Sequence, residues 1–300
     1  MKWSEIISQI RDKLQEQNEA FFSDARLMDT ARRVQAEVAA VTECLETEEE
    51  KDVSAGCIEC PLPEDCISVL YATFDGRPLA RVDVRRLDRS AYPSGSPMMY
   101  YIFGSKAGLY PSSSAAGKLM LWYSQRPPLG AFSIIHDGSS GASAATVSSS
   151  AVALTLTITG GSNSGSYSFD YANSSTNTVG GLIAAVNALG KGWSAARIVG
   201  CRSLEPSSNI EAITARSSFQ KQLIIDLSVK LPEEFQTLIE LGSIYRALWK
   251  DTEYEAGNVY KQEYLERLDA MRRVFSRRAS RRGPAAVRDV YSGGISSPAG

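Results

Sequence analysis

The spacing of apolar residues changes twice along this chain, and this change restricts the fold more than any single motif does. Near the amino end, Trp3, Ile6 and Ile10 follow the period of one helix face. In the middle of the chain apolar and polar residues alternate, as on a half-buried strand. Helical spacing returns after residue 231. Helices at both ends and strands between them predict an α+β fold.

The first part of the chain, residues 1–130, is predicted to contain long helices followed by a small sheet. The second helix is expected to start at Phe22-Ser23-Asp24, where Ser23 is a candidate N-cap and Phe22 a hydrophobic staple. Asp75-Gly76 between two β-rich runs predicts a hairpin. Further strands are expected around residues 99–103, 109–110 and 118–123.

Residues 131–217 are predicted to form an inserted β-rich domain made of a hairpin, a helix and a strand. Gly, Ser and Thr supply more than half of residues 138–181, yet Leu154, Leu156 and Ile158 alternate with polar residues, which indicates a hairpin rather than a linker. A helix capped by Thr178 and ended by Gly190, then a strand at 193–199, are expected next. The flanking strands at 118–123 and 223–229 are expected to pair with each other.

The last part of the chain is predicted to be a strand and two helices, residues 218–276, followed by an Arg-rich flexible tail, residues 277–300. Leu231-Pro232-Glu233-Glu234 is expected to open the first of these helices, with proline near its start and acids in its first turn. The apolar pattern of the second helix ends at Phe275, and Gly283-Pro284 prevents any continuation. We therefore expect the arginines after Phe275 to lie in flexible chain.

The overall charge excludes a protein that coats nucleic acid. Thirty-two basic residues oppose 34 acidic ones, for a net charge of −2. The sign is uneven, because residues 1–60 are acidic and residues 271–300 are rich in arginine. No apolar run approaches the length of a membrane span, and charges stand where a signal peptide would be apolar, so we expect synthesis and assembly in a cytoplasm.

The sequence has none of the common catalytic or cofactor motifs. His136 is the single histidine, and no nucleophile elbow, phosphate-binding loop or metalloprotease motif is present. Cys57 and Cys60 have the spacing of half a zinc site, but a second close pair of ligands is missing, so free thiols are the favoured interpretation. We expect no catalytic activity, no cofactor and no metal.

The order of several short segments resembles the head-to-tail adaptor, or connector, proteins of tailed bacteriophages. Each segment is weak evidence alone, and their succession carries the resemblance, which covers roughly residues 1–130 and 218–280. The segments are Phe22-Ser23-Asp24, Leu62-Pro63-Glu64-Asp65, Asp75-Gly76-Arg77-Pro78-Leu79, Pro97 to Gly104, Leu109-Tyr110-Pro111, Leu119 to Tyr123 and Leu231-Pro232-Glu233-Glu234. Residues 131–217 depart from the family.

This resemblance implies a structural protein of the virion. Members of the family form a ring of twelve subunits in the phage neck, dock to the portal, extend the channel for DNA ejection and provide the platform for tail or nozzle proteins. The expected partners are therefore other copies of this chain, the portal and tail proteins. Double-stranded DNA would pass without specific binding, and no membrane partner is expected.

Two charged segments are the candidate functional residues. An acidic lining lets DNA slide, so Glu46, Glu48, Glu49 and Glu50 are candidates for the DNA channel. An arginine-rich terminus can order against an acidic groove of a partner, most plausibly the portal. The residues concerned are Arg277, Arg278, Arg281 and Arg282.

Two other classes of function remain open from the sequence. A virion adhesin would explain the Ser/Thr-rich inserted domain, which could bind glycans through Tyr167, Tyr171 and Trp193, although packing in the core is the favoured role of these aromatic side chains. A nucleic-acid binder would explain the arginine tail, but the rest of the chain has no basic stripe.

Overall fold

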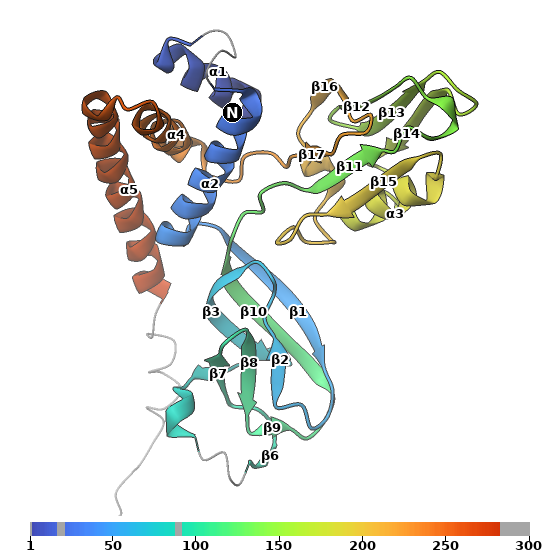
Figure 1. Ribbon diagram of the computed structural model, residues 1–300. Coiled ribbons are helices and arrows are strands. Elements are labelled where there is room, and N and C mark those ends of the chain that lie inside the picture. The colour runs from blue at the N-terminus through green and yellow to red at the C-terminus, as the bar shows by residue number, and fades with distance from the viewer. Residues whose placement is uncertain (1, 17–21, 88–91, 283–300) are drawn as a thin grey trace, which may run out of the picture.

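The computed structural model describes residues 2–16, 22–87 and 92–282, with side chains described as far as residue 275, and it shows a mixed α+β protein (Figure 1). The α+β class expected from the sequence is confirmed. In these ranges the α-helices are α1 (Trp3–Leu14), α2 (Asp24–Thr42), α3 (Val179–Leu189), α4 (Thr237–Lys250) and α5 (Tyr254–Arg282).

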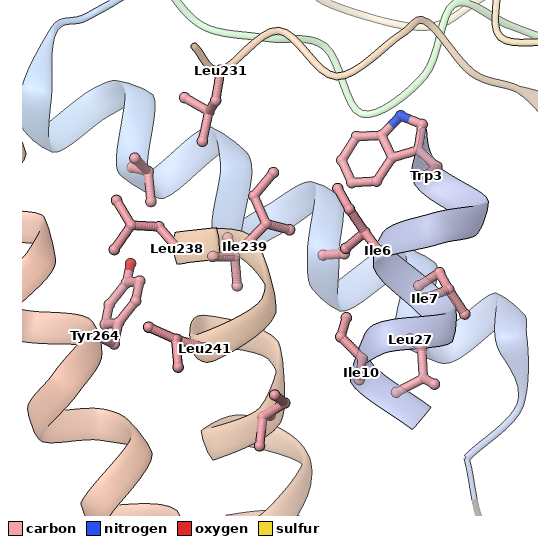
Figure 2. Close-up of a cluster of buried hydrophobic side chains, with 14 of the residues drawn as sticks. Trp3, Ile6, Ile7, Ile10, Leu27, Leu231, Leu238, Ile239, Leu241 and Tyr264 are labelled. Carbon is pink, nitrogen blue, oxygen red and sulfur yellow. The ribbon is translucent and has the colours of Figure 1, made fainter. Parts of the chain in front are cut away.

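Helices α1, α2, α4 and α5 pack around one apolar core, which we call the helical unit (Figure 2). The helix pattern of the sequence explains this packing, since Ile6 and Ile10 of α1 are fully buried on one face. Leu27 of α2 and Tyr264 of α5 are also in the core. The core thus joins the two ends of the sequence.

The helix starts follow the sequence with two differences. Ser23 stands at the N-cap of α2 with extended backbone, but its hydroxyl makes no capping hydrogen bond. The helix begins at Asp24, whose carboxylate accepts hydrogen bonds from Arg11 Nε at 2.9 Å and Nη2 at 2.6 Å. After Pro232 the chain first makes a 3₁₀ turn, Glu233–Phe235, and α4 begins only at Thr237. The helix predicted after Leu231 is therefore present but starts later.

Residues 46–125, which we call the β unit, form two four-stranded sheets that share one core and a two-stranded sheet of β6 (Ser94–Gly95) and β9 (Ser112–Ser113). The strand order of one four-stranded sheet is β1 (Glu46–Val53), β10 (Gly117–Gln125), β3 (Cys66–Phe74) and β4 (Arg77–Pro78). The order of the other is β2 (Glu59–Pro61), β8 (Lys106–Tyr110), β7 (Met99–Phe103) and β5 (Ala80–Arg81). Leu119, Leu121 and Tyr123 of the first sheet are buried in one cluster with Tyr100 and Leu109 of the second.

The hairpin turn predicted at Asp75-Gly76 in the β unit is confirmed. Asp75 and Gly76 both have positive φ, 46° and 76°, and join β3 to β4 as a tight hairpin. The acidic run 46–52 is a strand, β1, which its charged sequence did not indicate.

The third part, which we call the inserted module, contains α3 and two more sheets. One has the order β15 (Trp193–Arg197), β11 (Phe132–His136), β17 (Leu223–Ile225), and the other β14 (Gly165–Asp170), β13 (Ala153–Thr159), β12 (Ala144–Ser149), β16 (Ile213–Ser217). The hairpin β13–β14 confirms the alternating pattern. The Thr178 hydroxyl accepts a hydrogen bond from Gly181 N at 3.2 Å, and Gly190 follows the end of α3, as expected.

The expected pairing of the two flanking strands is wrong. Strand β10 pairs with β1 and β3, whereas β17 pairs with β11 inside the module. Ile225 and Leu227 belong to the core of the module, and burying them there outweighs pairing with an already flanked strand. The chain still leaves and returns at one place, because Ala131 N donates to Ile225 O at 2.7 Å. The division into domains stays a prediction.

The expected end of the last helix at Phe275 is also wrong, because α5 continues to Arg282. Met271 and Phe275 are the last side chains that the structure describes in the core, the Arg, Ala and Ser residues after them are compatible with a helix, and a helix breaker is met only at Gly283-Pro284. Arg277, Arg278, Arg281 and Arg282 thus lie on helical backbone. Residues 283–300 lie outside the described part of the chain.

A buried ion pair joins the helical unit to the inserted module. The Arg32 guanidinium donates through Nε and Nη2 to the two carboxylate oxygens of Asp226, both at 2.7 Å. The two side chains are 10% and 8% exposed. Beside this pair Trp3 Nε1 donates to Leu227 O at 2.8 Å, and Lys230 N donates to the Gln35 side chain at 3.0 Å. These bonds hold the returning chain against α1 and α2.

We predict that Asp226→Ala lowers the free energy of unfolding by about 3–5 kcal/mol, because it leaves the Arg32 charge buried and unpaired. The apolar double variant Arg32→Met with Asp226→Leu is expected to recover most of the loss. Urea denaturation followed by circular dichroism measures both. Asp29→Ala, which breaks the exposed pair with Arg33, is the matched control and is expected to cost about 0.5 kcal/mol or less. An equal cost for Asp226→Ala and the control would contradict this account.

Candidate interaction surfaces

Strand β1 divides the acidic segment between the two faces of its sheet. Because side chains alternate along a strand, Glu46, Glu48, Glu50 and Asp52 share one face and are all exposed. We call these four residues the acidic column. The column contains three of the four predicted channel residues, and its fourth member is Asp52, the last acidic residue of the same segment.

Glu49, the fourth predicted channel residue, lies on the other face. Its carboxylate is 3.5 Å from Lys51 Nζ and 3.4 Å from Arg202 Nη2 of the inserted module. Arg202 also donates to Thr47 Oγ1 at 3.2 Å. Glu49 therefore helps to attach the module to the β unit and is separated from the acidic column.

Aromatic side chains lie beside the acidic column. Glu48 is paired in register with Trp122 of β10, and Trp122 with Tyr71 of β3. The rings of Trp122 and Tyr71 are 5.2 Å apart, and Tyr71 is 44% exposed. Glu50 accepts a hydrogen bond from Lys118, and this bond raises the pKa of the lysine. This face of the sheet is thus both acidic and aromatic.

A second charged surface, which the sequence analysis missed, lies at the other side of the β unit. Four arginines occur within ten residues after the Asp75-Gly76 turn, in β4, in β5 and in the short 3₁₀ helix η1 (Val84–Arg86). All four are exposed, and none makes an ion pair with a residue that the structure describes. We call them the arginine edge: Arg77, Arg81, Arg85 and Arg86. Their density along the chain was the available signal.

The arginines predicted to bind a partner lie in the last turns of α5, where the structure describes the backbone but not their side chains. The two preceding arginines are described and exposed: Arg272, and Arg273, which pairs with Asp269. The basic segment therefore starts on the exposed face of α5, while Met271 and Phe275 still pack on the core.

The aromatic residues proposed for glycan binding do not form an exposed surface. Tyr171 and Trp193 are 6% and 4% exposed and belong to the core of the inserted module. Tyr167 is half-buried, donates to Asn163 O at 3.0 Å and has Lys191 Nζ 4.2 Å from its ring centre. These three side chains stabilise the module.

His136 and the Cys57–Cys60 pair, considered for catalysis or metal binding, lie in packed surroundings. His136 is fully buried, accepts a hydrogen bond from Gly138 N at 3.0 Å, and has its ring centre 5.0 Å from that of Trp193. Cys57 Sγ and Cys60 Sγ are 3.3 Å apart. Within the described ranges, no three His, Cys, Asp or Glu side chains are grouped as a metal site, and no helix is long and apolar enough to cross a membrane.

A buried carboxylate lies where the inserted module meets the start of α1. Glu211 is 7% exposed, and burial raises its pKa to about 7. The backbone amides of Ser4 and Trp3 and the charge of Lys2 act in the opposite direction, whereas the nearby Asp226 adds to the increase. The carboxylate therefore faces the amino end of a helix, which favours its charged form, in surroundings too dry to accept that charge fully.

We predict that the protein loses stability as the pH rises from about 4.5 to about 7, because the folded state keeps the Glu211 proton that the unfolded chain releases near 4.5. The loss is about 3 kcal/mol and levels off above pH 7. Glu211→Gln should flatten this slope and exceed the wild type in stability at pH 8. The exposed carboxylate variant Glu255→Gln should keep the wild-type slope. Unfolding midpoints from pH 4.5 to 8.5 measure this, and equal slopes for wild type and Glu211→Gln would refute it.

Comparison with known proteins supports the resemblance to phage adaptors that the sequence showed. Residues 1–134 match the family model described as SU10 adaptor protein, so the resemblance to phage head-to-tail adaptors is confirmed over α1, α2 and the β unit. The match makes residues 1–134 similar to a bacteriophage adaptor, which is a structural class of virion protein. No curated protein matches the chain.

Proposed function

We propose that this protein is a subunit of the ring that joins the head of a tailed phage to its tail, where it docks beneath the portal and continues the DNA channel. The observation that carries this proposal is the family match over residues 1–134, which spans the helices at the amino end and the whole β unit. The adaptor acts by shape and charge, so no catalytic group is required. Tail proteins would attach to the opposite face of the ring.

The acidic column is the part of the β unit suited to a DNA passage. Exposed carboxylates repel the phosphate backbone, so the duplex would move past them without binding. Glu46, Glu48 and Glu50 are exposed on one face, with Glu50 also bonded to Lys118, whereas Glu49 is bonded to Arg202 and Lys51 on the other face. In this role Glu49 would not face the DNA.

We expect the purified protein to form rings of twelve subunits. Negative-stain electron microscopy and mass photometry of the full chain, alone and with purified portal, measure ring size and stacking. Rings that stack coaxially on the portal support the proposal. A protein that stays monomeric from micromolar to high micromolar concentration at low salt, with and without portal, would refute it.

The arginines at the end of α5 are proposed to attach the ring to an acidic partner, the portal. Guanidinium groups bind carboxylates with paired hydrogen bonds, and twelve copies of a weak contact add up to firm attachment. These residues follow Phe275, the last side chain described in the helical core, on the continuation of α5, and in this role they would reach a neighbour from the end of that helix.

We predict that replacing Arg277, Arg278, Arg281 and Arg282 by Glu lowers the fraction bound to portal-containing particles at least tenfold. The circular dichroism spectrum should stay that of the wild type. Arg33→Glu, an exposed substitution on α2, is the control and should attach normally. Co-sedimentation with portal particles and a DNA-retention assay are measured together. Normal attachment with loss of DNA retention alone would show that these arginines bind nucleic acid instead.

A glycan-binding adhesin is not proposed as a second function. Two of the three aromatic residues on which that hypothesis depended, Tyr171 and Trp193, are in the core. The uncharged Ser/Thr surface of the module is better suited to contact with other proteins of the particle.

A further inference from the structure

The two four-stranded sheets of the β unit stack so that both have their edges on the same two sides. In the first sheet β1 and β4 are the outer strands, and in the second sheet β2 and β5 are. Strands β1 and β2 are near each other, since Lys51 Nζ donates to Pro61 O at 2.6 Å, and β4 leads directly into β5. Figure 1 shows β1 and β2 toward one margin of the unit and β3 and β7 toward the other. The unit therefore has a β1 side and a β4 side.

These two sides have opposite charge. The acidic column stands on β1, at the first side. The arginine edge stands on β4, β5 and η1, at the second side, where Asp83 is the one acidic residue in the segment 77–86 and accepts from Arg85 N at 3.0 Å. An open hollow lined by Arg81, Asp83, Val84 and Ile102 lies on this second side.

The two charged sides are too far apart to neutralise each other within one chain. Strands β10 and β3 separate β1 from β4, which places the two edges roughly 14 Å apart at ordinary strand spacing. Among the described residues, the arginines of the second side have no carboxylate partner of their own. A row of carboxylates on a neighbouring copy of the chain would supply the partners that the described residues do not.

We infer that the arginine edge of one copy docks against the acidic column of the next copy. A contact between two different sides of the same chain repeats from subunit to subunit, and it closes into a ring when the rotation per subunit divides the circle. Guanidinium groups and carboxylates in facing rows form paired, charge-assisted hydrogen bonds. This inference rests on the proposed ring and identifies the surfaces that build it. It places the acidic column in the contact between copies, and in that case the column does not line the DNA channel.

The same charges explain why the edges do not associate indiscriminately. Strand β1 is an outer strand whose exposed row is acidic, so two β1 edges repel each other, and two arginine edges do the same. The contact of unlike edges is favoured over both alternatives. Association should therefore have a direction, as a ring requires, and should weaken as salt screens the charges.

The test uses the full chain with two sets of charge reversals. The acidic-column variant is Glu46→Lys with Glu48→Lys and Asp52→Lys, and the arginine-edge variant is Arg77→Glu with Arg81→Glu and Arg85→Glu. Each variant alone has like charges on both sides, so we expect rings to be lost and monomers to form at 50 mM salt. Mixed one to one, the two variants should alternate and regain rings with an even number of subunits. Mass photometry and light scattering after size exclusion measure this.

Matched controls separate folding from assembly. Asp251→Lys with Glu255→Lys and Glu266→Lys reverses three exposed acidic residues of the helical unit and should keep wild-type rings. Arg77→Lys with Arg81→Lys and Arg85→Lys keeps the charge and should keep rings, with weaker assembly at 300 mM salt. Thermal melting by circular dichroism should show all variants folded, and recovery in the mixture is itself evidence of intact folding.

The outcomes distinguish this inference from the proposed function. Wild-type rings that persist in both charge-reversal variants would overturn the inference and leave the adaptor role standing. Rings that persist in the acidic-column variant but retain DNA would also overturn it, in favour of a channel lining. A wild-type protein that forms no ring would overturn the proposed function and the inference with it. Loss in each variant and recovery in the mixture support the inference.

Discussion

The buried pair of Arg32 and Asp226 is the contact on which the arrangement of the chain depends. It joins α2, near the amino end, to the segment that returns from the inserted module. Burial raises the pKa of Asp226, and the two hydrogen bonds from Arg32 oppose this effect. Because a charge buried without its partner is costly, the helical unit and the module are held in one register.

The neighbouring contacts extend this junction. Trp3 reaches Leu227 O, and Glu211 faces the start of α1, so the first helix is held against the returning chain at two places. On the other side of the module Arg202 reaches Thr47 and Glu49. The module is thus attached to both the helical unit and the β unit. These attachments leave the acidic column and the arginine edge exposed.

A helix or hairpin was predictable where a short stretch of sequence contains all the residues that cause it to form. The face formed by Ile6 and Ile10 requires only helical spacing, the hairpin after Phe74 only the Asp75-Gly76 turn, and the start of α3 only the Thr178 hydroxyl. Strand β1 was not predictable in this way, since five acidic residues within seven positions argue against a strand. It forms because β10, an apolar strand, pairs with it along its whole length.

The sequence by itself determined the α+β class, most helices and hairpins, and the presence of acidic and basic segments, because propensity, period and charge are local properties. Tertiary structure alone decided that β17 pairs with β11 and that Glu49 is separated from Glu48 and Glu50. It also decided that Arg77 and Glu46 stand on opposite sides of one unit. These outcomes depend on which strands, distant in sequence, bury the most apolar surface when they pair. The residues of one segment cannot show which of the alternative pairings buries more.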